Sequence, residues 1–405
     1  MVAYPGEPLN ILHTIGLKEL YPIIRVHFCV AGSFDEARFE DALMKCAQVA
    51  PEIFCKYVLA DNSFVPVVDD LEGVVYQNLD PDIDISRWDL FMDPQIRVYL
   101  NHHGEEADVT IFLSHILTDG AGAKQLLQLL ATAYNTRTVE GIVNHQDIDW
   151  LRKLLAEHQV EVKKETDHPA KPLTMPKLTS NKEQQTRRTH RLTLSKKLTA
   201  QLIKTSHKTG VTINDLLMAA YGQAVQRFSA TDQISLACPT DMRKFIPGPE
   251  ELRVANHTSR YNISVYSDVQ QPFAQAVRAV HDAMVANKQS FQCLASVKTL
   301  VDNYDRYSLA KLQQICEDNY HVRTISYTNF GIVDFAFAGC QISDFDMLGS
   351  YRRAPMFQVA VSTYEAQLIF AFAMIGTAEE ERVGNVVMLT MKDLLEKYVL
   401  EFSEN

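Results

Sequence analysis

The sequence predicts an α/β protein of two lobes, each mixing strands and helices around its own core. Strand-like alternation and helix-like spacing of apolar residues occur on both sides of a break in the pattern. That break, at residues 161–189, holds three prolines among many polar residues, which is typical of a linker. We therefore expect an N-terminal lobe at 1–160 and a C-terminal lobe at 190–405.

Composition narrows the class of protein. Of 405 residues, 46% are hydrophobic and 22% are charged, which is typical of a folded globular chain. The formal net charge of −11 argues against general nucleic-acid binding, which needs a basic surface. The longest dense apolar run, Leu368–Ile375, is far too short to span a bilayer, so we expect no transmembrane segment.

The N-terminal sequence and the pattern of cysteines indicate the cellular compartment. MVAYPGEPLN has no basic region leading into an apolar core, so the sequence predicts no signal peptide. The seven cysteines form no CxxC pair, a pattern that favours reduced thiols over a disulfide framework or a zinc site. We therefore expect a cytoplasmic protein.

The elements of the N-terminal lobe follow from apolar periodicity. Ile23–Val30 alternates apolar and polar residues and predicts a strand, and Ser33 is a candidate N-cap for the helix that follows. Ile96–Leu100 and Val109–Leu113 predict paired strands joined by a polar turn. Apolar residues at helical spacing over 126–133 predict a second helix.

The C-terminal lobe opens with the short predicted strand HRLTLS. Ser195 can cap a helix that stops near Gly210, and Thr212 with Asp215 resembles a capping box that opens a helix through Phe228. The remaining candidates are strands at Ile234–Ala237, Tyr261–Tyr266 and Thr324–Tyr327, a hairpin of Phe357–Thr363 with Leu368–Ile375, and a helix over Glu381–Val399.

The stretch FLSHILTDGAGAKQLL, residues 112–127, carries the strongest functional signal. His115 ends an apolar strand, Asp119 follows four residues later, and Gly120 and Gly122 precede a helical run. A phosphate cradle is disfavoured, because the dinucleotide fingerprint needs a third glycine where Gln125 stands. A metal site is also disfavoured, because two ligands are too few.

A purely structural histidine remains open on the residues alone. A second HxxxD pair, His145 with Asp149, shows that the spacing is common. That copy has no apolar strand before it and no glycine after it, so we interpret it as solvated surface.

The surroundings of the motif are similar to a known family along nearly the whole chain. SHILTDG resembles the HxxxDG motif of the CoA-dependent acyltransferase superfamily. Its members include non-ribosomal peptide condensation domains, alcohol acetyltransferases and polyketide-associated acyltransferases. GSFDEARFEDALMKCAQVAP resembles the family's first strand-to-helix passage, and VTINDLLMAAYGQAV resembles the opening helix of its second lobe.

Three further segments carry the resemblance. CPTDMRKF resembles the segment with the family's structural arginine, which places that role on Arg243. VANHTSRYNISV resembles the G-N-x-x-[NS] stretch, with Asn256 and Ser259 at its polar positions and alanine in place of glycine. SYTNFG resembles the S-N-x-G strand end, with Asn329 and Gly331 near the cleft. The resemblance implies that these last four residues bind substrate.

The resemblance implies two chloramphenicol-acetyltransferase-like lobes in a V, with the active site at their interface. His115 would be the general base on an acceptor hydroxyl or amine, which then attacks a pantetheine thioester. Asp119 would turn away and pair with the structural arginine, while the Gly120 N–H would face the oxyanion. Gly122 would keep the helix start uncrowded, and Ser114 stands where condensation domains usually have a second histidine.

The implied activity is that of an acyltransferase, alcohol O-acetyltransferase-like or condensation-domain-like. CoA or a phosphopantetheine thioester would be a co-substrate, with no bound cofactor and no metal, and a small alcohol or amine would be the acceptor. The alternatives are an enzyme that depends on an acyl carrier protein, of non-ribosomal peptide or polyketide type, and a catalytically silent two-lobed binding module. We expect a monomer, because one chain holds the whole cleft.

Overall fold

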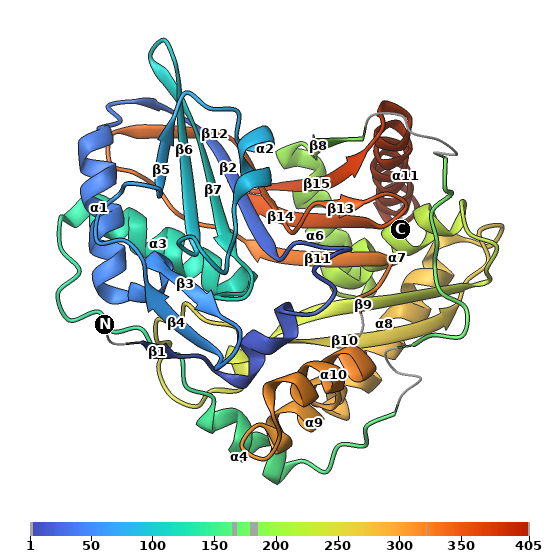
Figure 1. Ribbon diagram of the computed structural model, residues 1–405. Coiled ribbons are helices and arrows are strands. Elements are labelled where there is room, and N and C mark those ends of the chain that lie inside the picture. Colours follow the sequence, from blue (N-terminus) through green and yellow to red (C-terminus); the bar gives the residue numbers. More distant parts are fainter. Residues whose placement is uncertain (1–2, 164–167, 179–184, 321, 404–405) are drawn as a thin grey trace.

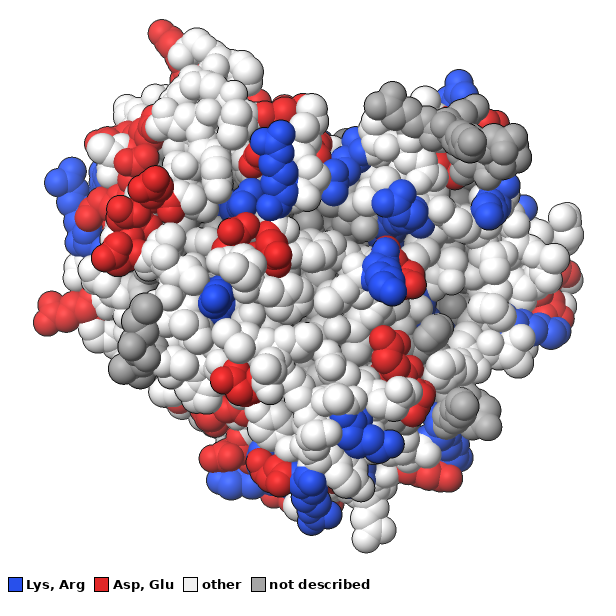
Figure 2. All heavy atoms as spheres, viewed as in Figure 1, with Lys and Arg blue, Asp and Glu red and all other residues white. Residues whose placement is uncertain are grey.

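The computed structural model describes residues 3–163, 168–178, 185–320 and 322–403, which form two α/β lobes arranged in a V (Figure 1). This arrangement confirms the predicted fold class. On the face shown in Figure 2, several Lys and Arg side chains border the notch between the lobes, and the surface below them is mostly uncharged. No helix in the described parts of the chain combines the length and apolarity needed to cross a bilayer.

The N-terminal lobe is built on a five-stranded sheet in the order β12-β2-β7-β6-β5. All neighbours in it are antiparallel except β5 and β6. Helices α1 and α3 pack against each other and share one apolar core with this sheet. The elements are β2 (Ile23–Gly32), α1 (Glu36–Val49), β5 (Val75–Gln77), β6 (Ile96–His103), β7 (Glu106–Ser114), α3 (Gly120–Thr136) and β12 (Cys340–Leu348).

A smaller sheet and short helices complete this side of the molecule. The small sheet runs in the order β1-β4-β3. Its strands are β1 (Tyr4–Pro5), β3 (Cys55–Val58) and β4 (Ser63–Pro66), and the 3-10 helix η2 (Pro51–Phe54) packs against it. Helix α2 (Pro81–Asp84) and the 3-10 helix η3 (Ile85–Arg87) adjoin each other. The 3-10 helix η1 (Pro8–His13) and helix α4 (Asp149–Glu157) contribute buried residues to the apolar core of the C-terminal lobe.

Strand β12 links the two lobes, and sequence patterning did not predict it. It pairs with β2 from Cys340 opposite Gly32 to Leu348 opposite Arg25, with a bulge after Ser343. The bulge breaks the period-two alternation that would have marked the strand. Residues 340–348 thus lie in the sheet of the N-terminal lobe, while the division of the chain at 161–189 stays a prediction.

The C-terminal lobe holds a second five-stranded sheet and a long antiparallel pair, β9 with β10. In this lobe, helices α6, α7 and α8 pack against α11. The strands are β8 (Thr186–Thr193), β9 (Gln233–Asp241), β10 (Thr258–Tyr266), β11 (Ile325–Ile332), β13 (Arg352–Arg353), β14 (Phe357–Tyr364) and β15 (Gln367–Gly376). The helices are α6 (Lys196–Thr209), α7 (Ile213–Gln226), η4 (Met242–Phe245), α8 (Phe273–Gln289), η5 (Gln292–Leu294), α9 (Ala295–Asn303), α10 (Leu309–Tyr320) and α11 (Ala378–Ser403).

Local capping signals predicted two helix starts in this lobe. The Ser195 hydroxyl accepts the N–H of Leu198, and Thr212 with Asp215 forms the predicted capping box. Ser33 was a wrong prediction, because Asp35 caps α1 instead. The N–H of Ser33 donates to Gly339 O, so the chain remains extended beside β12 and the helix begins later.

Candidate active site

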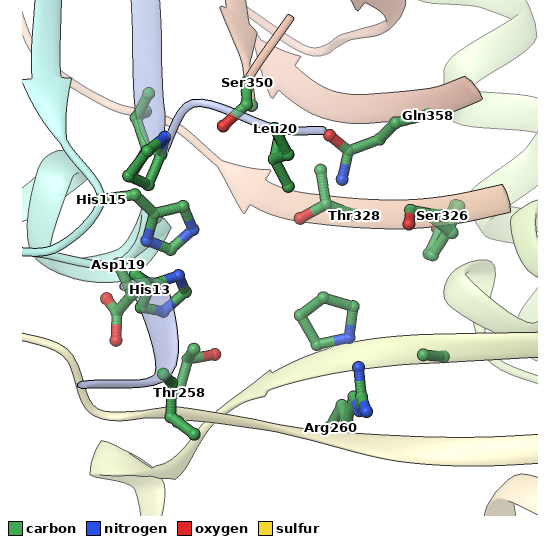
Figure 3. A pocket seen from close by; sticks show the side chains of 18 of the residues that line it. His13, Leu20, His115, Asp119, Thr258, Arg260, Ser326, Thr328, Ser350 and Gln358 are labelled. Carbon is green, nitrogen blue, oxygen red and sulfur yellow. The ribbon is translucent and has the colours of Figure 1, made fainter. Parts of the chain in front are cut away.

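A cavity of about 250 Å³ lies between the two lobes (Figure 3). On one side it is lined by the turn from β7 to α3 and by the end of η1. Strands β9, β10 and β11 supply much of the opposite wall, and β13 and β14 close it. The cavity therefore collects side chains from segments that are far apart in the sequence.

The HxxxDG turn is held by the carboxylate of Asp119, which caps α3. One carboxylate oxygen accepts the N–H of Gly122 at 2.8 Å. The other accepts the N–H of His257 at 2.6 Å and Nη1 of Arg243 at 3.0 Å. With its oxygens engaged in this way, Asp119 is fixed by the protein.

Arg243 completes the support of this turn. Its Nη2 donates to the carbonyls of Arg253 and Ala255 at 2.9 and 2.8 Å. Burial would raise the pKa of Asp119, but the adjacent Arg243 guanidinium and the hydrogen bonds hold the pKa below its usual value. The structure thus contains the buried Asp119–Arg243 ion pair that the family resemblance implies.

Both glycines of the motif lie where a side chain would clash. A Cβ on Gly120 would lie 2.5 Å from the Phe330 ring of β11. A Cβ on Gly122 would overlap the Thr118 hydroxyl and lie 3.0 Å from the carbonyl of Ala255. In the described parts of the chain, no acceptor is found for the N–H groups of Gly120 and Ala121, which open α3 beside the cavity.

His115 lines the cavity at the end of β7. Its backbone is fixed at both ends, because its N–H donates to Pro22 O at 2.8 Å and its carbonyl accepts from Asn256 at 2.9 Å. Its Nδ1 is buried and has no hydrogen-bond partner among the described residues. Burial lowers the pKa of His115, so the imidazole is neutral at neutral pH.

A second imidazole lies against the first. His13, the last residue of η1, stacks on His115 with ring centroids 3.8 Å apart and an angle of 17° between the ring planes (Figure 3). Burial lowers the pKa of His13 well below its usual value, and the neighbouring His115 adds to this effect. His13 also lines the cavity.

Sequence reasoning missed His13. Its partner lies about a hundred positions away, so no local motif contains both histidines. The available signal was a histidine within an apolar run, residues 8–15, combined with Ser114 at the position of the family's usual second histidine.

The other predicted site residues lie at different distances from the cavity. Ser114 is fully buried and its hydroxyl accepts the N–H of Ile116. Asn256 donates to the carbonyls of His115 and Ile116, and Ser259 donates to the carbonyl of Cys293. These three residues lie outside the cavity lining, and their roles stay predictions.

Asn329 lines the cavity, while Gly331 lies just beyond it. The Asn329 side chain accepts the N–H of Gly331 at 2.8 Å and donates to Asn214 at 3.0 Å. Gly331 has a φ of +68°, which favours glycine. Lys124 of α3 donates to the carbonyls of Phe330 and Ile332, so β11 is tied to the helix that starts at the motif.

One candidate metal cluster lies on the sheet, away from the cavity lining. The ligand atoms of His27, Cys29 and Asp108 lie within 4.8 Å of one another. They are already paired, because Nδ1 of His27 contacts the Thr110 hydroxyl and the Cys29 thiol donates to Asp108. We therefore assign no metal to them.

Comparison with known proteins gives the family. The sequence profile of the condensation domain matches residues 82–292, just over half of the chain. No curated protein matches the chain by sequence.

Solved structures share the fold at low sequence identity. Polyketide synthase associated protein 5 from Mycobacterium tuberculosis has a TM-score of 0.65 and 16% identity, over 98% of both chains. The epimerization domain from the third module of tyrocidine synthetase B has a TM-score of 0.65 and 14% identity, over 100% of this chain and 98% of that one. A trichothecene 15-O-acetyltransferase from Fusarium sporotrichioides has a TM-score of 0.67 and 11% identity, over 96% and 94%.

The family match covers the HxxxDG turn, Arg243 and the β9–β10 pair, and the structural neighbours extend the likeness over both lobes. The chain therefore belongs to the condensation-domain family, within the CoA-dependent acyltransferase superfamily.

Proposed function

We propose that the protein is an acyltransferase that moves an acyl group from a pantetheine thioester to a hydroxyl or amine. The observation that carries this proposal is the imidazole of His115, which lines the cavity beside the first turn of α3 while hydrogen bonds fix its backbone on both sides. Family membership supports the same reaction class.

The proposed reaction balances at each step. His115 takes the proton of the acceptor hydroxyl or amine as that atom attacks the thioester carbonyl. The N–H groups of Gly120 and Ala121, with the helix dipole behind them, stabilise the oxyanion of the tetrahedral intermediate. Collapse then breaks the C–S bond, and the leaving thiolate takes the proton from His115.

In this mechanism Asp119 does not relay protons, because its oxygens are bound to Arg243 and to backbone N–H groups. Its role is to hold the turn, and Asn256 shares it by bonding the carbonyl of His115. His13 closes one face of the imidazole and keeps water from it, which favours the neutral form.

Acyl-CoA is the proposed donor, and an acyl carrier protein is the alternative. Condensation-domain membership favours the carrier, whereas the acetyltransferase-like fold of a neighbour favours CoA. A silent binding module is the third possibility. It predicts that neither kind of donor is consumed.

Release of free thiol tests the proposal. Acetyl-CoA and an acetylated carrier protein are each incubated with a panel of alcohols and amines. We expect acceptor-dependent thiol release from one of the two donors, and a loss of at least a hundredfold in His115→Ala. His145→Ala is the matched control, because it removes the same side chain from the other HxxxD pair.

The outcomes separate the three readings. Release from acetyl-CoA supports the leading proposal, and release only from the carrier supports the alternative donor. A folded His115→Ala protein with full activity would contradict the mechanism. If neither donor is consumed with any acceptor, the silent module is favoured.

A further inference from the structure

Three buried arginines line the same cavity as the two histidines. Arg260 lies on β10, Arg323 precedes β11 and Arg352 lies on β13, and none is more than 7% exposed. Figure 3 shows Arg260 across the cavity from the stacked imidazoles. The proposed chemistry at His115 uses none of these guanidinium groups, so their presence needs another explanation.

In the described parts of the chain, no carboxylate forms an ion pair with Arg352. Its Nη1 donates to the carbonyl of Arg323 at 3.1 Å, while its Nε is buried and has no partner within the described residues. Asp119 and Asp241 are the carboxylates that line the cavity, and Arg243 binds both of them. Neither is therefore free to neutralise Arg352.

The charge of Arg352 persists in its buried position. Burial lowers its pKa to about 10, which leaves the guanidinium protonated at neutral pH. The group that interacts with it electrostatically is Tyr221, whose own pKa is raised by burial, so the phenol is uncharged. A buried cation without a counterion is strongly unfavourable for folding, and such a cost is typical of binding sites.

A guanidinium group is suited to one class of ligand. Its planar fork of N–H donors matches the geometry of a carboxylate or a phosphate and can bind either through two hydrogen bonds. Arg260 and Arg323 have other contacts of their own and add positive charge around the same space.

We propose that Arg352 forms an anion subsite in this cavity, and that it binds a carboxylate or a phosphate group carried by a substrate of the acyl transfer. The subsite places an anionic group at a fixed position relative to His115. It would select substrates by charge as well as by shape. That this ligand is a substrate rests on the proposed function, whereas anion binding at Arg352 does not.

Binding is measured without turnover, as the shift in melting temperature with ligand concentration. Two matched pairs distinguish the sources of the anion. The pair 4′-phosphopantetheine and pantetheine tests a phosphate on the donor arm, and the pair N-acetylalanine and N-acetylalaninamide tests a carboxylate. We expect the anionic member of one pair to bind at least tenfold more tightly than its neutral partner. Equal binding within both pairs would overturn the proposal.

Two variants locate the effect. Arg352→Gln should reduce the affinity for the preferred anion at least tenfold. Arg353→Gln removes the same charge from the neighbouring exposed residue and should leave that affinity unchanged. Equal losses in the two variants would overturn the assignment to Arg352.

A structural role for Arg352 predicts a different result. A guanidinium kept for binding destabilises the fold while no ligand is bound. In the ligand-free protein, the Arg352→Met variant lacks that buried charge, so it should melt at the same temperature as the wild type or higher. A clear decrease would mean that the guanidinium serves the fold, and the proposal would fail. Acyl transfer without anion preference would overturn only this inference. Anion binding without thioester consumption would overturn only the proposed function.

Discussion

The imidazoles of His13 and His115 stack within 3.8 Å, and burial lowers the pKa of both. A third histidine, His257, is fully buried behind the turn, where burial and the adjacent Arg243 lower its pKa to about 4. At neutral pH these side chains are therefore uncharged in the folded protein. Each would take up a proton more readily in the unfolded chain, where the ordinary pKa is about 6.5.

Stability should therefore depend on pH. Because the folded-state pKa values are depressed, the stabilisation is complete above about pH 6.5 and is lost as the pH falls toward the folded-state values. His257 alone should remove roughly 2 kcal/mol of unfolding free energy between pH 7 and pH 5. Urea unfolding across this range measures the slope, and His257→Gln should flatten it. A wild-type stability that stays constant down to pH 5 would contradict the account.

The Asp119–Arg243 pair should be worth far more than a surface ion pair. Arg243→Met leaves a buried carboxylate without its cation, which should cost about 3–5 kcal/mol. Lys298→Met breaks the more exposed pair with Asp302 within α9 and should cost under about 1 kcal/mol. Equal losses in urea unfolding would show that the buried pair does not hold the turn.

At the scale of elements, the start of α3 depends on the absence of a side chain at Gly122. In an unhindered helix, alanine stabilises by about 1 kcal/mol relative to glycine. Here the new Cβ would overlap the Thr118 hydroxyl and crowd the Ala255 backbone, so the sign should reverse. We expect Gly122→Ala to lose about 1–3 kcal/mol in urea unfolding. A gain in stability would mean that the turn can open without cost.

Elements defined by local chemistry could be predicted from the sequence. The capping box at Thr212 and the cap at Ser195 are each complete within four residues, and both are present. The HxxxDG turn belongs to the same class, because one short segment carries the strand end, the histidine, the cap and the glycines.

Features set by distant contacts could not be predicted. Ser33 fails as a cap because Gly339, far along the chain, engages its backbone. The stack of His13 on His115 and the approach of Arg352 to the cavity likewise depend on tertiary packing. Each involves partners that no window of the sequence contains together.

At the scale of the whole molecule, the lobes are joined by more than the linker. Strand β12 lies in the N-terminal sheet although it follows β11 of the other lobe, and Lys124 bonds the carbonyls of Phe330 and Ile332. The Asp119–Arg243 pair adds a buried link between the lobes. We therefore expect the two lobes to unfold together.

The two tryptophans allow this to be measured. Trp88 lies in the N-terminal core and Trp150 in the C-terminal core, so each reports on one lobe. Each of the variants Trp88→Phe and Trp150→Phe keeps a single tryptophan. In urea, the fluorescence transition of each variant should coincide with the global unfolding transition that circular dichroism records for the same variant. A tryptophan signal that changes well before or after the circular dichroism would show that the lobes unfold separately.

In the proposed mechanism, the cleft transfers acyl groups with neutral His115 as the base. The pH dependence of kcat/KM for acyl transfer tests it most directly, because this ratio reports the free enzyme's essential base. We expect a plateau that continues below pH 6.5 before the rate falls, since burial lowers the pKa of His115. His115→Ala should retain only a small residual rate without this fall. A wild-type rate that falls at or above pH 6.5, or a His115→Ala protein with the wild-type profile, would contradict the account.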